Sequence, residues 1–360
     1  MKKLFFLFIT GLTVSASYSQ DVSDALRYSQ DNITGTARFR AMSGAFGAVG
    51  GDLSSLSVNP AGSAVFNTNQ VGISFSNQNI KNNSNYFGTE TSDKENSFTL
   101  NQAGGVFVFK NNNPNAGWNK ITIGATYENT NNFNNSTFSA GTNPTNSIDG
   151  YFLAFANGIP LGNISNADYR DLDYREQQAF FGLEGYVIDP LTNNPENSQY
   201  ISNVPEGGNY FQENEIYTRG YNSKVGFNIA TSYKDRLYFG ANLNVHVTDY
   251  RRSSSFYEYN KNPLQTYETI SNVRFNNELY TYGNGFSFQL GAIGKVTDSF
   301  RLGVAYESNT WYELYDELSQ SLYSTTETSA GETFNNSVNP NIVNVYESYT
   351  LQTPDKWTFS

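Results

Sequence analysis

The sequence predicts an all-β fold: a transmembrane antiparallel β-barrel with an N-terminal hatch of short helices in its lumen. Long segments alternate apolar and polar side chains, as strands with one apolar face do. No run of residues after the first 20 has the apolar length of a helical membrane span. Charged residues make up only 15% of the chain, where about a quarter is usual. The 26 Tyr, 27 Phe and 30 Gly are suited to the aromatic girdles and tight turns of a barrel.

Residues 1–19 predict a secretory signal peptide. Lys2 and Lys3 precede an apolar run from Leu4 to Val14, and small residues follow before Gln20. The apolar run is shorter than the roughly 20 residues of a membrane span, so a retained N-terminal anchor is the less favoured alternative. The chain contains no Cys, which excludes both disulfides and a lipid attached through cysteine.

Residues 20–68 predict the compact hatch. The segment begins with two helix-like pieces, Val22 to Tyr28 and Ala37 to Met42. A Gly-rich stretch from Ala41 to Phe66 follows and contains the turn sequence Asn59-Pro60-Ala61-Gly62. Small residues allow close backbone approach, and Pro60 restricts Asn59 to extended geometry. This composition indicates a rigid segment that packs closely against inward-facing side chains.

Residues 69–360 predict the strands and loops of the barrel. Alternation begins at Val71, Ile73 and Phe75 and recurs from Ile121 to Tyr127. The clearest hairpin, Lys224 to Tyr250, turns at Lys234-Asp235-Arg236, and a second one runs from Gly285 to Glu307. The return strand of the first hairpin, Leu237 to Val247, has one apolar face over eleven residues, which matches a tilted membrane strand of about 9–11 residues.

The lengths of the connections predict which end faces which side of the membrane. We expect the short turns at Lys234 to Arg236 and Val296 to Ser299 on the periplasmic side. The Asn-rich segment Asn129 to Asn146 and the region Arg251 to Phe275 are expected to be extracellular loops. Asp355 to Ser360 predicts the opening of another strand after roughly eight to ten others, so we expect the given sequence to stop before the barrel closes; a barrel that closes with fewer strands is the less favoured alternative.

The hatch carries a resemblance to a known family. Met42-Ser43-Gly44-Ala45, then Asp52, then Asn59 to Gly62 are similar to the N-terminal plug of outer-membrane transporters for long-chain fatty acids and aromatic hydrocarbons (FadL/TodX type). The strand from Arg301 to Tyr306 also resembles a family strand. The resemblance covers the hatch well and the strands loosely, and the long loops match nothing specific.

The resemblance implies a non-enzymatic channel in the outer membrane of a Gram-negative bacterium. It takes up hydrophobic small molecules passively and releases them through a side opening in the wall, with no cofactor. Asn59, Pro60, Ala61, Gly62, Gly44 and Asp52 are the implied gate and ligand residues, although the turn is alternatively only a support for the hatch. Tyr151, Phe152 and Phe155 are candidates for an outer apolar site; a membrane strand or a packed loop explains the segment equally well.

Other chemistry finds little support in the sequence. The net charge of −11 argues against nucleic acid, whose phosphates favour Lys and Arg. His246 is the only histidine, which argues against His-pair zinc sites and a His-based catalytic triad, and we interpret it as a lumen-lining residue rather than a haem ligand. The glycines between Gly44 and Gly51 lack the preceding strand and the following Lys-Ser/Thr of a phosphate-binding loop.

Two further clusters have ordinary explanations. The acidic residues Asp168, Asp171, Asp173 and Glu176 are interleaved with arginines and predict a solvated loop rather than a calcium site. Trp311, Tyr312, Tyr315 and Trp357 predict an aromatic belt at the membrane interface.

Two other functional classes compete with the channel. One is a barrel that serves in protein secretion or attachment, because fold does not determine function. The other, a soluble secreted enzyme, is disfavoured by the one-sided apolar strands and by the missing catalytic constellation.

Overall fold

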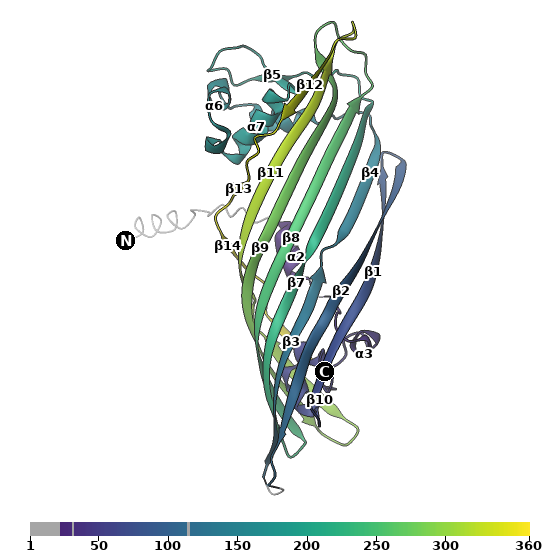
Figure 1. Ribbon diagram of the computed structural model, residues 1–360, viewed down its shortest axis with the longest axis vertical. Coiled ribbons are helices and arrows are strands. Elements are labelled where there is room, and N and C mark those ends of the chain that lie inside the picture. The colour runs from purple at the N-terminus through teal and green to yellow at the C-terminus, as the bar shows by residue number, and fades with distance from the viewer. Residues whose placement is uncertain (1–21, 31, 114–115) are drawn as a thin grey trace, which may run out of the picture.

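The computed structural model describes residues 22–30, 32–113 and 116–360, so the predicted signal peptide at residues 1–19 lies outside the described residues. Most of the described chain forms one large antiparallel sheet, drawn out along the long axis of the molecule (Figure 1). This confirms the predicted all-β class. Among the described helices, none has the length and apolarity to cross a membrane.

The sheet consists of long neighbouring strands joined mainly by hairpins. The main path runs β1-β2-β3-β7-β8-β9-β10-β15, while β4 pairs with β7, and β11 pairs with β9 and with β12, β13 and β14. The strands are β1 (Gln70–Tyr86), β2 (Thr89–Lys110), β3 (Trp118–Asn132), β4 (Asn135–Asn143), β7 (Tyr210–Tyr233), β8 (Leu237–Asn260), β9 (Thr269–Lys295), β10 (Arg301–Glu307), β11 (Trp311–Glu327), β12 (Thr333–Val338), β13 (Asn344–Val345), β14 (Tyr349–Gln352) and β15 (Lys356–Phe359).

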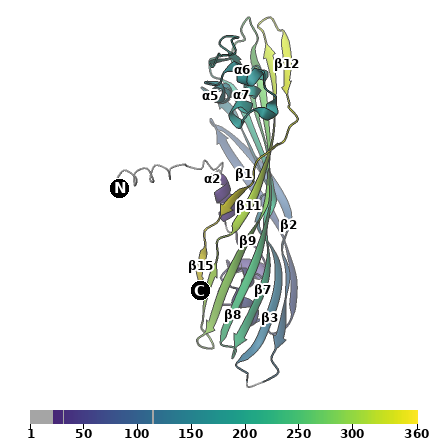
Figure 2. The same ribbon diagram turned by 90° about the vertical axis from the view of Figure 1, so that its left-hand side faces the viewer.

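Two helical regions lie on the same side of this sheet (Figure 2). The N-terminal one, which we call the hatch (residues 22–68), contains α2 (Val22–Ser29), α3 (Ala37–Ala41), α4 (Ser55–Val58) and the 3₁₀ helix η1 (Pro60–Val65). The predicted helix-like pieces are thus confirmed as α2 and α3. The second, the cap (residues 147–208), contains α5 (Asp149–Ala156), α6 (Leu161–Ser165), η2 (Tyr169–Asp171), α7 (Tyr174–Glu184) and a small hairpin of β5 (Ile188–Pro190) and β6 (Tyr200–Ser202).

The two faces of the sheet reverse the usual pattern of burial. Along the first half of β8, Phe239 and Leu243 are 44% and 56% exposed, whereas Asn242 and Asn244, which point to the opposite face, are buried. Neighbouring strands repeat this arrangement, with exposed apolar side chains at Phe107, Phe109, Ile121, Ile123, Phe227, Ile229, Phe286, Leu290 and Leu302. The hatch covers the polar face, and the apolar face stays open. We call these the covered face and the open face.

The predicted hairpins are confirmed, and their strands are longer than expected. Strands β7 and β8 pair from Tyr233↔Leu237 at the turn to Tyr210↔Asn260 at the far end. The expected loops at Asn129 to Asn146 and Arg251 to Phe275 are therefore wrong, because β3, β4, β8 and β9 occupy most of both segments. Beyond Val247 both faces are largely polar, so apolar alternation disappears although the backbone ladder continues.

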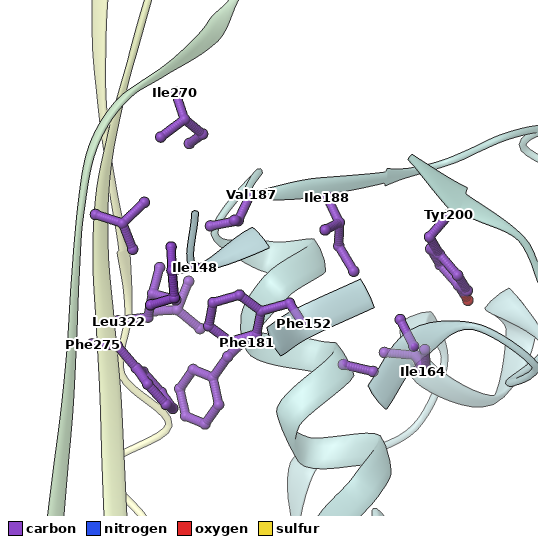
Figure 3. Packing of buried hydrophobic residues seen from close by; sticks show 14 of the residues in the cluster. Ile148, Phe152, Ile164, Phe181, Val187, Ile188, Tyr200, Ile270, Phe275 and Leu322 are labelled. Carbon is purple, nitrogen blue, oxygen red and sulfur yellow. The ribbon is translucent and has the colours of Figure 1, made fainter. Parts of the chain in front are cut away.

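The cap is fixed to the far end of β9 and β11 by an aromatic core. The ring of Phe152 lies 5.4 Å from that of Phe275 on β9, and Phe181 lies 5.6 Å from the same ring (Figure 3). Leu322 on β11 is fully buried beside them. The segment around Phe152 is thus a helix rather than a strand, in keeping with the good helix formers Leu153, Ala154 and Ala156.

A buried carboxylate adds a polar attachment for the cap. Glu258, near the far end of β8, accepts hydrogen bonds from the backbone nitrogen of Ile148 at 3.0 Å and from Gln212 Nε2 at 2.7 Å. Ser147 Oγ donates a third one. Burial raises the pKa of Glu258 above its ordinary value, against the opposing effect of these hydrogen bonds.

Candidate functional site

The Asn-Pro-Ala-Gly turn begins η1 and is completely enclosed. Asn59 is 1% exposed and Ala61 is fully buried. The Asn59 side chain accepts a hydrogen bond from the backbone nitrogen of Ala61 at 3.1 Å, which caps the helix. Its amide group donates to the carbonyl oxygens of Gly47 at 2.7 Å and Ala292 at 3.1 Å. One side chain therefore joins the turn, the Gly-rich stretch and the wall strand β9.

The wall offers this turn a row of small residues. Ala230 on β7 pairs with Gly240 on β8, which pairs with Gly291 on β9. The row continues at both ends, to Thr122 on β3 and to Ala305 on β10. Five adjacent strands thus place a small side chain, or none, at the same level of the covered face. We call this row the hatch seat.

The fit between the turn and the hatch seat leaves no room for another atom. A Cβ atom added to Gly240 would lie 2.4 Å from the carbonyl carbon of Pro60. A Cβ at Gly291 would lie 2.0 Å from Asn59 Oδ1 and 2.8 Å from Pro60 Cδ. Glycine is therefore required at both positions for the turn to approach the wall this closely.

Hydrogen bonds add to this contact on either side. Asn228 on β7 donates from Nδ2 to the Pro60 carbonyl oxygen at 3.0 Å. The hydroxyl of Ser63, three residues further along η1, lies 3.0 Å from the hydroxyl of Thr122 on β3. Buried polar groups are costly unless they are paired, so these bonds favour one position of the turn on the wall.

The other predicted gate residues, Asp52, Gly44 and Gly62, make contacts within the hatch itself. The Asp52 carboxylate accepts hydrogen bonds from Thr36 Oγ1 and from the backbone nitrogen of Ser54, both at 2.9 Å. Gly44 has a φ of +76°, a conformation that favours glycine. The Gly62 carbonyl accepts from the backbone nitrogen of Gly51 at 3.0 Å. All three residues hold the fold of the hatch, and a direct role for them in a gate stays a prediction.

Next to the hatch seat, two neighbouring strands are interrupted at the same level. Between β10 and β11, which both pair with β9, lie Ser308, Asn309 and Thr310. Between β14 and β15, which pair with β11 and β10, lie Thr353 to Asp355. Asn309 Nδ2 donates to the Thr353 carbonyl oxygen at 2.8 Å, while the backbone nitrogens of Thr353 and Ser308 still donate to the carbonyl oxygens of Thr310 and Phe288 at 3.1 and 2.9 Å. The pairing here is therefore irregular but not lost. Pro354 has no N–H to donate to a ladder.

A chamber of 380 Å³ lies between the hatch and these interruptions. Its wall side includes Ser308, Thr310 and Pro354. The remaining lining is rich in polar groups from the hatch and the covered face, among them Tyr28, Asn32, Glu128, Asn222, Lys224, His246, Gln289 and Tyr312. Lys224 and Glu128 form an ion pair at 3.8 Å, and both side chains are at least nine-tenths buried. The chamber therefore combines hydrogen-bonding groups with a buried ion pair.

His246 lies on the covered face, as the sequence predicted. Its Nε2 lies 2.9 Å from Ser287 Oγ and its Nδ1 lies 3.4 Å from the hydroxyl of Tyr312. Tyr312 is 3% exposed, so its predicted place in an interfacial belt is wrong, because the strand directs it toward the hatch. Its neighbour Trp311 and the more distant Trp357 are exposed on the open face, and their place in an interfacial belt stays a prediction.

Three of the four acidic residues of the cluster in the cap, Asp168, Asp173 and Glu176, cap the starts of helices. Asp168 accepts from the backbone nitrogen of Arg170 and begins η2. Asp173 and Glu176 form a reciprocal capping box at the start of α7. Within the part of the chain that the structure describes, no group of three or more His, Cys, Asp or Glu side chains could hold a metal ion. The predicted solvated loop is wrong in its secondary structure, because η2 and α7 occupy the segment, and the expectation that it binds no calcium stays a prediction.

The predicted outer apolar residues divide into two kinds. Phe152 is fully buried in the core of the cap, so its predicted place on an exposed surface is corrected. Tyr151 remains 37% exposed, and Phe155 contacts its ring at a centroid distance of 4.9 Å. An outer apolar site that involves these two residues stays a prediction.

Sequence reasoning missed the hatch seat and the interruptions. The signal for the seat was present, because glycine in a strand interior often marks close backbone approach. Comparisons with protein-family models, curated proteins and solved structures gave no match to this chain. The resemblance to the fatty acid transporter family thus rests on the hatch motif and on one strand.

Proposed function

We propose that the protein is an outer-membrane channel for the passive uptake of hydrophobic small molecules, such as long-chain fatty acids or aromatic hydrocarbons. In this proposal it resembles the FadL/TodX-type transporters, and the ligand leaves through the wall beside the hatch. Two parts of the proposal have separate support: the membrane placement and the route.

The open face supports the membrane placement. On β8 the exposed apolar side chains extend over the eleven residues from Leu237 to Val247. At a rise of about 3.3 Å per residue and a tilt near 45°, this length spans roughly 25 Å, the height of the apolar band of outer-membrane barrels. Stacked tyrosines lie just beyond the band, with the ring of Tyr282 5.4 Å from that of Tyr315. Aromatic rings of this kind are typical of the membrane interface.

The chamber, the interrupted strands on one side of it and the hatch on the other side support the route. The chamber adjoins the interruptions of the wall strands on one side and the hatch on the other. A ligand that enters it meets polar groups suited to a head group, while the open face beyond the wall suits an acyl chain. Burial of each CH₂ contributes about 0.8 kcal/mol, which favours transfer of the chain into a membrane. The route therefore needs no energy source.

The single observation that carries the proposal is the seating of the Asn-Pro-Ala-Gly turn. Its contact with Gly291 on β9 lies one strand from the interrupted β10, because Ala305 on β10 pairs with Gly291, and its contact with Gly240 on β8 lies two strands away. A shift of the turn would alter the wall beside the interruption. Asn59, Pro60 and Ala61 are accordingly the proposed gate residues.

Transport in liposomes tests the proposal. The purified protein, reconstituted in liposomes that contain a fluorescent fatty-acid-binding protein, should accelerate the arrival of an added long-chain fatty acid over protein-free liposomes. A parallel assay with a labelled aromatic hydrocarbon separates the two ligand classes. Equal rates with and without the protein, for both ligands and at verified protein insertion, would contradict the proposal.

The alternative, a barrel for secretion or attachment, is favoured by one observation. The cap presents exposed apolar and aromatic side chains at Tyr174, Tyr186, Leu191 and Ile201. A partner protein that co-purifies with the intact chain and is lost on substitution of Tyr186 and Ile201 would support it, together with absent transport.

A further inference from the structure

We infer that the open face carries a binding site for one molecule of anionic phospholipid, at the end of the sheet where the short turns lie. The inference rests on the membrane placement proposed above but is independent of transport. It arises from a groove and from a concentration of positive charge that meet at this end.

The groove crosses four strands on the open face. It has a volume of 820 Å³, within the range of about 300–1,000 Å³ typical of small-molecule sites. Its sides are the exposed apolar side chains of Phe109, Trp118, Ile121, Ile229 and Phe239. Ala230 and Gly240 also line the groove, although both face the hatch on the covered side, and the small side chain of Ala241 leaves space between the larger rings on the open face. An acyl chain is the occupant that such an apolar channel in a membrane-facing wall would accept.

The groove reaches the turn end of the sheet, where lysines lie. Lys110 lines it directly. Lys234, in the β7–β8 turn, lies with Nζ 5.4 Å from the ring of Tyr233, whose ring in turn is 5.2 Å from that of Trp118. The backbone nitrogen of Lys234 donates to the Gly117 carbonyl oxygen at 2.8 Å, which fixes the turn beside the groove. A head group at this end of the chain would therefore lie within reach of two ammonium groups.

This end of the sheet differs in charge from the rest of the protein. The whole chain has a net charge of −11. The three short-turn connections and the strand ends beside them nevertheless carry six basic side chains against two acidic ones, Asp235 and Asp298. Two of the basic ones, Lys120 and Arg301, donate to the hatch carbonyl oxygens of Phe66 and Val49 at 3.1 Å, so the proposed head-group site rests on the other four, Lys110, Lys234, Arg236 and Lys295. A basic cluster at the edge of an apolar band attracts anionic lipid. Charge complementarity thus selects phosphatidylglycerol or cardiolipin over a zwitterionic lipid.

The site has a structural connection to the hatch. Gly240 lines the groove on the open face, while Pro60 presses against the same residue from the covered face. Only the thickness of one backbone separates the bound chain from the hatch seat. The lipid would therefore support the wall from outside at the level where the turn presses on it.

Tryptophan fluorescence provides a direct test, because the chain has only three Trp. The Trp311→Phe/Trp357→Phe variant leaves Trp118 in the groove as the single probe. The full chain is reconstituted in vesicles that contain either bromine-labelled phosphatidylglycerol or bromine-labelled phosphatidylcholine, since bromine on the acyl chain quenches a ring in contact. We expect phosphatidylglycerol to be preferred at Trp118 by about 5- to 25-fold, from roughly fivefold for each of the one or two lysines that reach the head group.

Variants identify the source of the preference. Lys110→Gln/Lys234→Gln should reduce it to about twofold or less, whereas the matched control Lys81→Gln/Lys94→Gln, which removes two lysines from β1 and β2, should leave it unchanged. Ala241→Leu fills the groove and should lower quenching of Trp118 by either lipid. Equal quenching of Trp118 by the two lipids would overturn the inference. It would also be overturned if the lysine variant kept the full preference for phosphatidylglycerol and Ala241→Leu left the quenching unchanged.

The same experiment separates this inference from the membrane placement. The Trp118→Phe variant retains Trp311 and Trp357, which lie on the open face outside the groove. If brominated lipid quenches those two but shows no preference at Trp118, the lipid site fails and the placement stands. If neither Trp311 nor Trp357 is quenched, the placement itself fails.

Discussion

A single methyl group on the wall should dislodge the hatch turn. In Gly291→Ala the new Cβ would lie 2.0 Å from Asn59 Oδ1 and 2.8 Å from Pro60 Cδ, so either the turn or the wall must move. Overpacking of this kind costs about 1–3 kcal/mol. Because about 1.4 kcal/mol corresponds to a factor of ten, the population with an unseated turn should rise by roughly 5- to 150-fold.

The matched control lies three residues away on the same strand. A Cβ at Gly294 would have Leu237 Cδ2 as its nearest neighbour, at 3.8 Å, which is an ordinary contact. Gly294→Ala shares with Gly291→Ala the smaller conformational freedom of the unfolded chain, so this effect cancels between the two variants.

Hydrogen exchange of the η1 amides measures the unseated population. We expect faster exchange at Ala61 to Val65 in Gly291→Ala, unchanged exchange in Gly294→Ala, and similar protection of the long β7 and β8 strands in both. Equally slow exchange of the η1 amides in the two variants would refute the reasoning, because it would show that the position of the turn does not depend on a glycine in the hatch seat.

Three further variants test other parts of the account. Asn59→Asp should destabilise the hatch more than Asn59→Ala, because the new carboxylate would face the Gly47 and Ala292 carbonyl oxygens. The protease sensitivity of the hatch measures this difference, and the opposite order would contradict the assigned hydrogen bonds. Asp173→Ala should lower the stability of the cap by about 1 kcal/mol in hydrogen exchange of α7, with Asp171→Ala as control, and calcium should change neither. Burial raises the pKa of Glu258, which lies beyond the apolar band, so the folded cap favours the protonated form of this side chain. Its contribution to cap stability is therefore complete below the ordinary glutamate pKa and is lost as the pH rises through the raised pKa. The unfolding temperature of the cap should therefore fall less with rising pH in Glu258→Gln than in the unchanged protein. An identical dependence of the unfolding temperature on pH in the two proteins would exclude the Glu258 carboxylate as its origin.

The parts of the fold that depend on neighbours in sequence were predictable. Alternation revealed the β7–β8 hairpin, and the helix-like pieces of the hatch appear as α2 and α3. The cap was not predicted, because the apolar run from Tyr151 to Ala156 has no clear period and fits a short helix or a strand equally well. The long strand ends beyond Val247 were mistaken for loops because polar side chains on both faces conceal the alternation.

The candidate site was predictable only on the side of the hatch. The Asn-Pro-Ala-Gly turn is visible as four consecutive residues. Its seat is formed by Ala230, Gly240 and Gly291, which are far apart in the sequence and meet only through the register of three strands. Register follows from long-range pairing, so a single sequence does not reveal which small residues share a level.

A reversible lock of the hatch tests the central claim most directly. The hydroxyls of Ser63 and Thr122 lie 3.0 Å apart, and the chain has no Cys of its own, so Ser63→Cys/Thr122→Cys should form one defined disulfide between η1 and the wall. The control Ser76→Cys/Thr99→Cys joins two wall strands, at a hydroxyl separation of 3.3 Å, without touching the hatch. We expect oxidation to stop fatty acid uptake in the first variant, reduction to restore it, and neither to affect the control. Undiminished uptake through the fully oxidised Ser63–Thr122 variant would contradict a channel gated by this turn.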